Sequence, residues 1–135
     1  MATLEQERAS FALNKIEELK RNDQRKKELP KYKTQLLKLP ARLHTSGLGQ
    51  TVAFYLASGS GSPEATICGW LESWLRTVKV YGDGRLIDWI TGSVKDLEGE
   101  AGKAETQYRQ ASAEARALAV WLKRFAEAFI AGEPA

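Results

Sequence analysis

The sequence predicts an all-α fold, a compact bundle of about five to six helices with a long C-terminal helix. Three observations favour this class. Apolar residues recur every three or four positions along most of the 135-residue chain, which is the period of a helix with one buried face. A capping signal stands at the start of the first such pattern, and the last pattern continues over about three heptads.

A first helix is predicted from about Leu4 to about Asn22. Thr3 and Gln6 form a capping box, in which each side chain satisfies a backbone N–H of the other residue. The apolar side of this helix is then formed by Leu4, Phe11, Ala12, Ile16 and Leu19.

A second helix is predicted after the charged, unpatterned residues 23–29. Pro30 suits its first turn, where no intrahelical N–H is needed. Pro40 falls inside the pattern and predicts a kink or a break there. The apolar side comprises Tyr32, Leu36, Leu39 and Leu43.

The middle of the chain predicts shorter elements. Gly47 and Gly49 mark a boundary before a short third helix that is predicted to end near Ser58. Residues 59–63 are predicted to form a loop. A turn is expected over residues 81–84, and residues 86–90 fit either a helix or a short strand. A fourth helix is indicated by Ile67, Trp70, Leu71, Trp74, Leu75 and Val78, whose two tryptophans suit core packing better than base stacking.

The last helix is predicted from about Lys103 to Ala131, a length of about 40 Å. Its apolar seam is either a coiled-coil arm or the buried stripe of a central bundle helix. Ala119, Ala126 and Ile130 broaden the stripe, which favours the bundle. The seam itself comprises Tyr108, Ala111, Ala115, Leu118, Leu122, Phe125 and Phe129.

Length and composition predict one domain over residues 1–135. The single cysteine, Cys68, cannot pair within the chain and fits a reducing compartment. No apolar run approaches the ~18 residues of a membrane-spanning helix, so we expect a soluble, cytoplasmic protein without membrane contact.

The charge is concentrated in one segment. Between Lys20 and Arg42 stand nine Lys or Arg and two acidic residues, a local charge of +7, whereas the whole chain carries +3 and the remainder therefore −4. Such segregation is typical of a protein that lies against a polyanion, and nucleic acid is the obvious one. The alternative is a merely solvated helix surface. Helical spacing favours the first interpretation, because it places Lys31, Lys38 and Arg42 on one side, apart from the apolar stripe.

The residues do not assemble a recognisable catalytic site. The sole histidine, His44, stands beside the basic segment and suits a surface or capping position. No cluster has metal-ligand spacing, and the glycines at 47–49 and 59–61 lack the other residues of a phosphate-binding loop. We therefore expect no enzyme activity, no catalytic residues, no metal and no cofactor.

Three segments resemble the small helical subunit of the type III-B CRISPR effector complex, also called the RAMP module. They are LEQERASFALNKI (Leu4 to Ile16), LPARLHTSGLGQTVAFYL (Leu39 to Leu56) and WLKRFAEAFIAGE (Trp121 to Glu133). The middle, residues 58–101, carries no matching motif.

The resemblance implies a non-catalytic protein of antiviral defence with an all-α fold. Copies of the subunit would stack as a minor filament, which a Cas10-type large subunit caps. A separate, repeated backbone subunit would cleave the target, and other subunits would hold the CRISPR RNA while target RNA passes alongside. In this sequence the family pattern includes Leu39-Pro40, Gly47 to Gln50 and Lys123-Arg124.

These observations lead to one hypothesis with two alternatives. Lys31, Lys38 and Arg42, together with Lys123 and Arg124, are predicted to form a positive RNA-binding groove that contacts phosphates without reading sequence. The alternatives are a purely structural assembly spacer and a generic helical nucleic-acid-binding adaptor outside any CRISPR complex.

Overall fold

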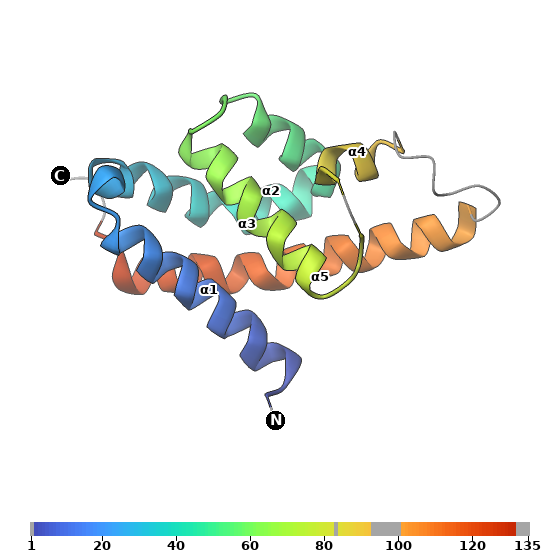
Figure 1. Cartoon of the computed structure of the whole chain (residues 1–135), viewed down its shortest axis with the longest axis horizontal. Helices are drawn as coiled ribbons and strands as arrows, with labels where there is room; N and C mark the ends of the chain where they lie inside the picture. Colours follow the sequence, from blue (N-terminus) through green and yellow to red (C-terminus); the bar gives the residue numbers. More distant parts are fainter. Residues whose placement is uncertain (1, 83, 93–100, 132–135) are drawn as a thin grey trace.

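The computed structural model describes residues 2–82, 84–92 and 101–131, with the backbone alone for residues 101–104. Every regular element in these ranges is a helix, so the predicted all-α class is confirmed (Figure 1). The elements are α1 (Leu4–Arg21), the 3₁₀ helix η1 (Asp23–Glu28), α2 (Leu29–Leu56), α3 (Pro63–Thr77), α4 (Leu86–Ile90) and α5 (Ala101–Phe129).

The predicted capping box at the start of α1 is confirmed. The backbone N–H of Gln6 donates to Thr3 Oγ1 at 3.1 Å, and the N–H of Thr3 donates to Gln6 Oε1 at 2.8 Å. The helix ends at Arg21, after which Asn22 accepts a hydrogen bond from the N–H of Gln24 and opens η1.

The break in α2 is at Gly47, and the kink or break predicted at Pro40 is wrong in position. Gly47 has φ 82° and ψ 168°, and it is the one residue inside α2 with non-helical angles. Pro40 stays helical because its ring fixes a helix-compatible φ, and because Leu39 and Leu43 on either side of it are buried in one core. The predicted separate helix after Gly47 is thus the second arm of α2, residues 48–56.

The two uncertain middle elements are helices. Ser62 caps α3 by accepting a hydrogen bond from the N–H of Ala65 at 3.0 Å, and Pro63 occupies the first turn. Residues 86–90, which fit a helix or a strand by sequence, form the short helix α4. Residue 83 of the predicted turn and residues 132 and 133 of the third resembling segment lie outside the described residues.

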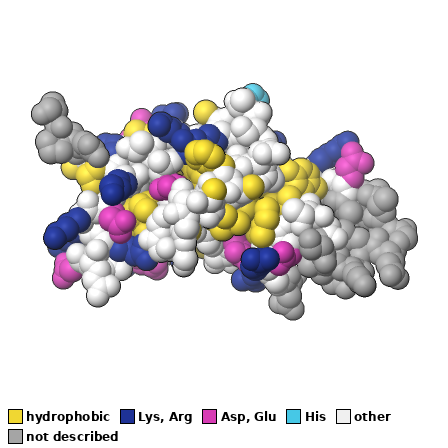
Figure 2. All heavy atoms as spheres, turned by 90° about the horizontal axis from the view of Figure 1, so that it is seen from above, with side chains coloured by type: hydrophobic (Ala, Val, Ile, Leu, Met, Phe, Trp, Pro, Cys, Tyr) yellow, Lys and Arg dark blue, Asp and Glu magenta, His cyan; other side chains and the backbone are white. Residues whose placement is uncertain are grey.

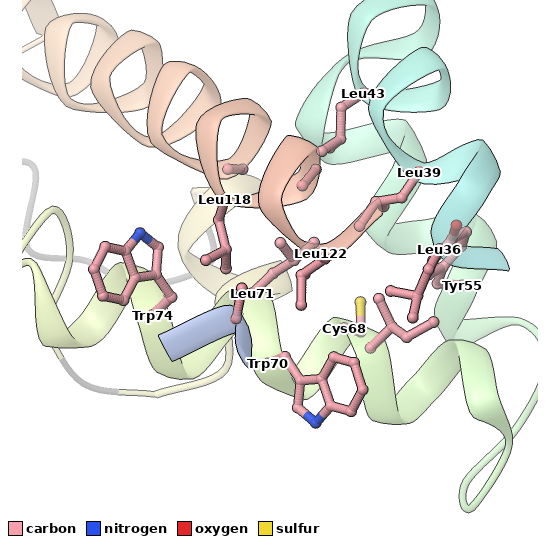
Figure 3. Close-up of a cluster of buried hydrophobic side chains, with 14 of the residues drawn as sticks. Leu36, Leu39, Leu43, Tyr55, Cys68, Trp70, Leu71, Trp74, Leu118 and Leu122 are labelled. Atoms are coloured by element: carbon pink, nitrogen blue, oxygen red, sulfur yellow. The ribbon is translucent and has the colours of Figure 1, made fainter. Parts of the chain in front are cut away.

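The core is shared by all the long helices. The first arm of α2 and α5 run antiparallel beside each other, α1 crosses α5, and α3 packs on α2 (Figure 1). Leu36, Leu39, Leu71, Leu118 and Leu122 meet between them, each at most 1% exposed (Figure 3). Because α5 is covered on more than one side, it is the central helix of a bundle, as the broad stripe predicted.

The buried stripe of α5 departs from the predicted seam at its C-terminal end. Ala126 and Ile130 are buried, whereas Phe125 is half-buried and Phe129 is 47% exposed. A straight helix has 3.6 residues per turn, so a heptad repeat drifts around it by about 20° per heptad. The predicted positions 125 and 129 have therefore rotated toward one edge, where Lys20 lies 5.8 Å from the Phe129 ring centroid.

Candidate nucleic-acid interface

Three of the predicted RNA-binding residues share one flank of α2. At about 100° per residue, Lys31, Lys38 and Arg42 fall within about 40° of one another around the helix axis. Lys31 and Lys38 are exposed, and among the described residues neither has an ion-pair partner. The two ammonium groups, which lie about two helical turns apart on this flank, are therefore available to an external anion.

Arg42 is held by the protein itself. Its Nη1 donates to Gln35 Oε1 and to the hydroxyl of Tyr55, the latter at 3.1 Å. The guanidinium also lies over the rings of Phe54 and Tyr55, 4.8 and 5.4 Å from their centroids. Burial raises the pKa of Tyr55, and the hydrogen bond from Arg42 offsets part of that rise. Arg42 thus joins the two arms of α2, a structural role that its spacing did not indicate.

The other two predicted residues lie on α5. Lys123 is half-buried, and Arg124 is exposed with its Nη1 3.7 Å from Glu127 Oε1. Arg124 follows the buried Leu122 by two residues, or about 200° of rotation, so it points away from the core.

Among the described residues, no hydrogen bond or ion pair connects these two α5 cations to the flank of α2. Figure 2 shows one face of the molecule, on which Lys and Arg side chains are spread along its length with acidic groups among them.

Other cations of the basic segment are also engaged. Arg25 turns inward, where Nη1 donates to the hydroxyl of Tyr32 and to Thr66 Oγ1, the latter at 3.0 Å. Lys26 lies 3.0 Å from Asp23. The local charge of the segment therefore overstates the number of cationic groups that are free to bind a ligand. Sequence alone does not show which arginines donate hydrogen bonds to hydroxyl groups of their own protein.

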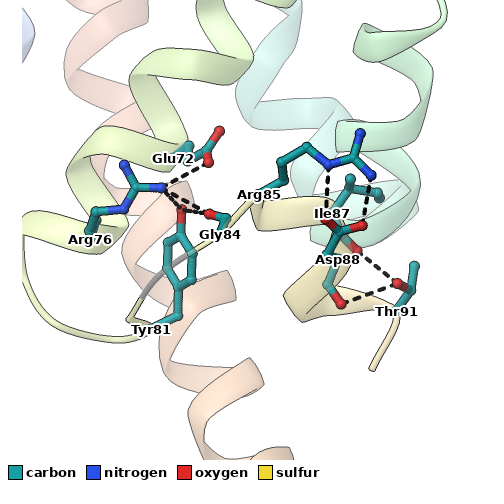
Figure 4. Close-up of polar contacts among 8 residues, drawn as sticks. All are labelled: Glu72, Arg76, Tyr81, Gly84, Arg85, Ile87, Asp88 and Thr91. Carbon is teal, nitrogen blue, oxygen red and sulfur yellow. Dashed lines mark hydrogen bonds and ion pairs between the residues drawn. The ribbon is translucent and has the colours of Figure 1, made fainter. Parts of the chain in front are cut away.

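The arginines of the α3–α4 connection are tied in similarly (Figure 4). Arg76 Nη2 donates to Glu72 Oε1 at 3.0 Å, to the Tyr81 hydroxyl at 3.1 Å and to the carbonyl of Gly84 at 2.9 Å. Arg85 forms a two-point ion pair with Asp88, and this pair lowers the pKa of the Asp88 carboxyl. These side chains fasten the loop and are poor candidates for contact with a ligand.

A hollow at the bend of α2 was not expected from the sequence. It has a volume of about 250 Å³. Phe54 in its wall is 56% exposed, and it lies off the apolar side of the second arm. That off-stripe position is the signal by which sequence reasoning could have found it. The lining residues are Arg42, Ser46, Gln50, Thr51 and Phe54.

Groups with catalytic potential do not gather in the described part of the chain. No three His, Cys, Asp or Glu side chains within it are close enough to hold a metal ion. Burial raises the pKa of the Cys68 thiol to about 12, so this group stays protonated. Of the helices described, none has the length and apolar character needed to cross a membrane.

Comparison with known protein families agrees with the fold and with the resembling segments. Residues 4–129 match the family model described as CRISPR-associated protein (Cas_Cmr5). The match runs through the middle of the chain, where no motif was recognised. The chain therefore belongs to the Cmr5 family, the small and generally non-catalytic structural subunit of the type III-B CRISPR Cmr complex.

Proposed function

We propose that this subunit supports the binding of target RNA in the type III-B complex through phosphate contacts, without catalysing a reaction. The observation that carries the proposal is the pair of exposed lysines, Lys31 and Lys38, on one flank of α2. Lys123 and Arg124 on α5 provide a second set of contacts. Arg42 contributes mainly by holding the two arms of α2 in place.

The chemistry of this flank suits the RNA backbone better than base edges. A lysine ammonium is a compact charge on a flexible stem, which neutralises phosphates but does not read a base in a defined orientation. Tyr32, the aromatic residue beside Lys31, is fully buried and hydrogen-bonded by Arg25. The flank would therefore stabilise RNA of any sequence, as a complex that is guided by base pairing requires.

The partners follow from the family. We propose that copies of this chain stack as a minor filament beside the repeated backbone subunit, with a Cas10-type large subunit at one end. In this arrangement the CRISPR RNA is held by other subunits, and the target RNA passes the cationic flank. RNA cleavage, in antiviral defence, belongs to a different subunit.

The test is the salt dependence of target RNA binding by the assembled complex. If about four phosphates are neutralised by each copy, each copy contributes about −3 to the slope of log affinity against log salt. Replacing both Lys31 and Lys38 by alanine should lower affinity and make the slope less steep by about 1.4 for each copy, because each lost contact with a single strand removes about 0.7. Lys31→Ala and Lys38→Ala are also measured singly, and Lys79→Ala, which removes one exposed charge outside this flank, is the control for each of them.

Two results separate this proposal from the assembly spacer. If the double variant binds RNA with unchanged affinity and slope, the flank does not contact RNA. If the double variant instead fails to enter the complex, the lysines contact a partner subunit. Crosslinking of target RNA to this chain within the intact complex provides the direct check.

A further inference from the structure

We infer that the hollow at the bend of α2 binds one unpaired nucleobase of single-stranded RNA, stacked on the exposed ring of Phe54. The inference rests on the proposed function, and it adds a base-contacting site to the phosphate-contacting flank. The hollow adjoins that flank through Arg42, which belongs to both.

The bend itself creates the site. With φ 82° at Gly47, the second arm of α2 turns back from the first, so that Ser46 on one arm faces Gln50 and Phe54 on the other. Thr51 Oγ1 donates to the carbonyl of Arg42 at 3.1 Å and fixes the two arms to each other. The volume of about 250 Å³ exceeds what a single water occupies, and the hollow is open to solvent.

Phe54 is presented as a stacking platform. It is the most exposed of the large apolar side chains in the described residues, at 56%. The guanidinium carbon of Arg42 lies over one face of the Phe54 ring, 4.8 Å from the ring centroid. Hydrogen bonds to Gln35 and Tyr55 hold that guanidinium in place. The ring is therefore oriented before a ligand arrives, which reduces the entropy lost on binding. Base–aromatic stacking is the usual way in which proteins hold single-stranded nucleic acid without sequence preference.

The lining favours a base over a peptide of a partner subunit. The exposed lining is mainly apolar, which suits the flat face of a base, and the positive charge of Arg42 at its edge suits the phosphate that a nucleotide carries and an apolar peptide side chain lacks. Ser46 and Gln50 are exposed and can hydrogen-bond to the edge of a base. Lys38 stands one helical turn before Arg42, within reach of the phosphate of the same nucleotide.

The first experiment compares two probes on the full-length chain, a short oligouridylate and an abasic oligonucleotide of equal length. Phe54→Leu keeps an apolar side chain but removes the flat ring, and Phe54→Trp keeps a flat ring. We expect Phe54→Leu to bind the oligouridylate about 5- to 100-fold more weakly, with binding of the abasic probe unchanged. Phe54→Trp should retain affinity. Phe129→Leu, at a phenylalanine that is 47% exposed on α5, is the matched control.

The second experiment uses the assembled complex with target RNA that carries 5-iodouridine. Irradiation should crosslink this RNA to the peptide that contains Phe54, and the crosslink should be lost in Phe54→Leu. Its absence from the unaltered protein, equal loss of affinity for both probes, or unchanged oligouridylate binding by Phe54→Leu would each overturn the inference. Failure of Phe54→Leu to assemble would assign the hollow to a partner subunit instead.

The two proposals fail in distinguishable ways. Loss of the phosphate contacts at Lys31 and Lys38 weakens both probes, because both carry phosphates. Loss of stacking at Phe54 weakens only the probe with bases. If the lysine variants lower affinity and Phe54→Leu does not, the phosphate-contacting flank stands and the base site falls.

Discussion

Arg8 and Glu114, which are 106 residues apart in the chain, form a two-point ion pair between α1 and α5. Arg8 Nε donates to Glu114 Oε1 at 2.5 Å and Nη2 donates to Oε2 at 2.9 Å. The indole N–H of Trp74 on α3 donates to the same carboxylate at 2.9 Å. The side chains of Arg8 and Glu114 are only 18% and 12% exposed. This one carboxylate therefore joins three helices at a position where water competes weakly.

Glu114→Gln should lower the free energy of unfolding by about 2 kcal/mol, because it weakens charged hydrogen bonds that are largely shielded from water. Thermal or denaturant unfolding measures the change. Glu105→Gln is the control, since its pair with Arg109 is 65% and 76% exposed and should contribute less than about 1 kcal/mol. Equal effects of the two substitutions would show that the buried pair has no special role.

The same pair predicts acid sensitivity. The hydrogen bonds from Arg8 lower the pKa of the Glu114 carboxyl, although burial opposes them. A lowered pKa in the folded state means that this contribution is complete above the carboxyl's ordinary value of about 4.3. It is lost as the pH falls through the lower folded value. The stability difference between the unaltered protein and Glu114→Gln should therefore shrink below about pH 4. A difference that stays constant with pH would contradict the assignment.

Gly47→Ala should destabilise the protein by about 1 to 3 kcal/mol, because φ 82° with ψ 168° is a conformation that residues with a Cβ rarely adopt. Space is not the reason, since a Cβ at this position would have no described neighbour within 4 Å. Gly69→Ala is the control. It lies in α3 with equally open space, and alanine there should stabilise the helix by up to about 1 kcal/mol. Opposite signs for the two variants are the expected result in denaturant unfolding.

Leu122→Ala should cost about 2 to 5 kcal/mol, because it leaves a cavity in the core where α5 meets the other helices. Val120 lies two residues earlier on the same helix and is 47% exposed. Val120→Ala should therefore change the free energy of unfolding by less than about 1 kcal/mol. The pair tests whether α5 is the central helix of the bundle. A small effect at position 122 would contradict that arrangement.

The Cys68 thiol should resist alkylation in the native protein. Burial raises its pKa to about 12, so almost no thiolate exists near pH 8, and the side chain is 5% exposed. Iodoacetamide labelling, followed by mass spectrometry, should be slow until denaturant is added. Rapid labelling of the folded protein would indicate that α3 opens locally.

Periodicity predicted most of the fold because burial of an apolar stripe depends on spacing within one helix. The capping box at Thr3, the first-turn Pro30 and the long stripe around Leu118 and Leu122 are all local patterns, and each is confirmed. Pro40 was misleading because its fixed φ is itself compatible with a helix, and because the burial of Leu39 and Leu43 in one core offsets the backbone hydrogen bond that it removes. The end of the seam at Phe129 was misplaced because a heptad repeat ignores the drift of a straight helix.

The cationic residues were harder to interpret from sequence. Spacing grouped Lys31, Lys38 and Arg42 correctly on one flank, but it gave no sign that Tyr55 and Phe54 would take up the guanidinium of Arg42. Arg42 and Tyr55 are brought together by the bend at Gly47. The hollow beside Phe54 has the same origin, and a linear pattern does not contain it.

The sequence by itself determined the helical class, the stripes that form the core, the basic flank of α2 and the resemblance to a CRISPR small subunit. These depend on residues that are near one another along the chain or on motifs read in order. Only the tertiary structure decided which cations remain free, where α2 bends and how Arg8 finds Glu114. Those outcomes depend on partners brought together by packing, since a guanidinium is available to an external anion only when no carboxylate, hydroxyl or ring of its own fold reaches it first.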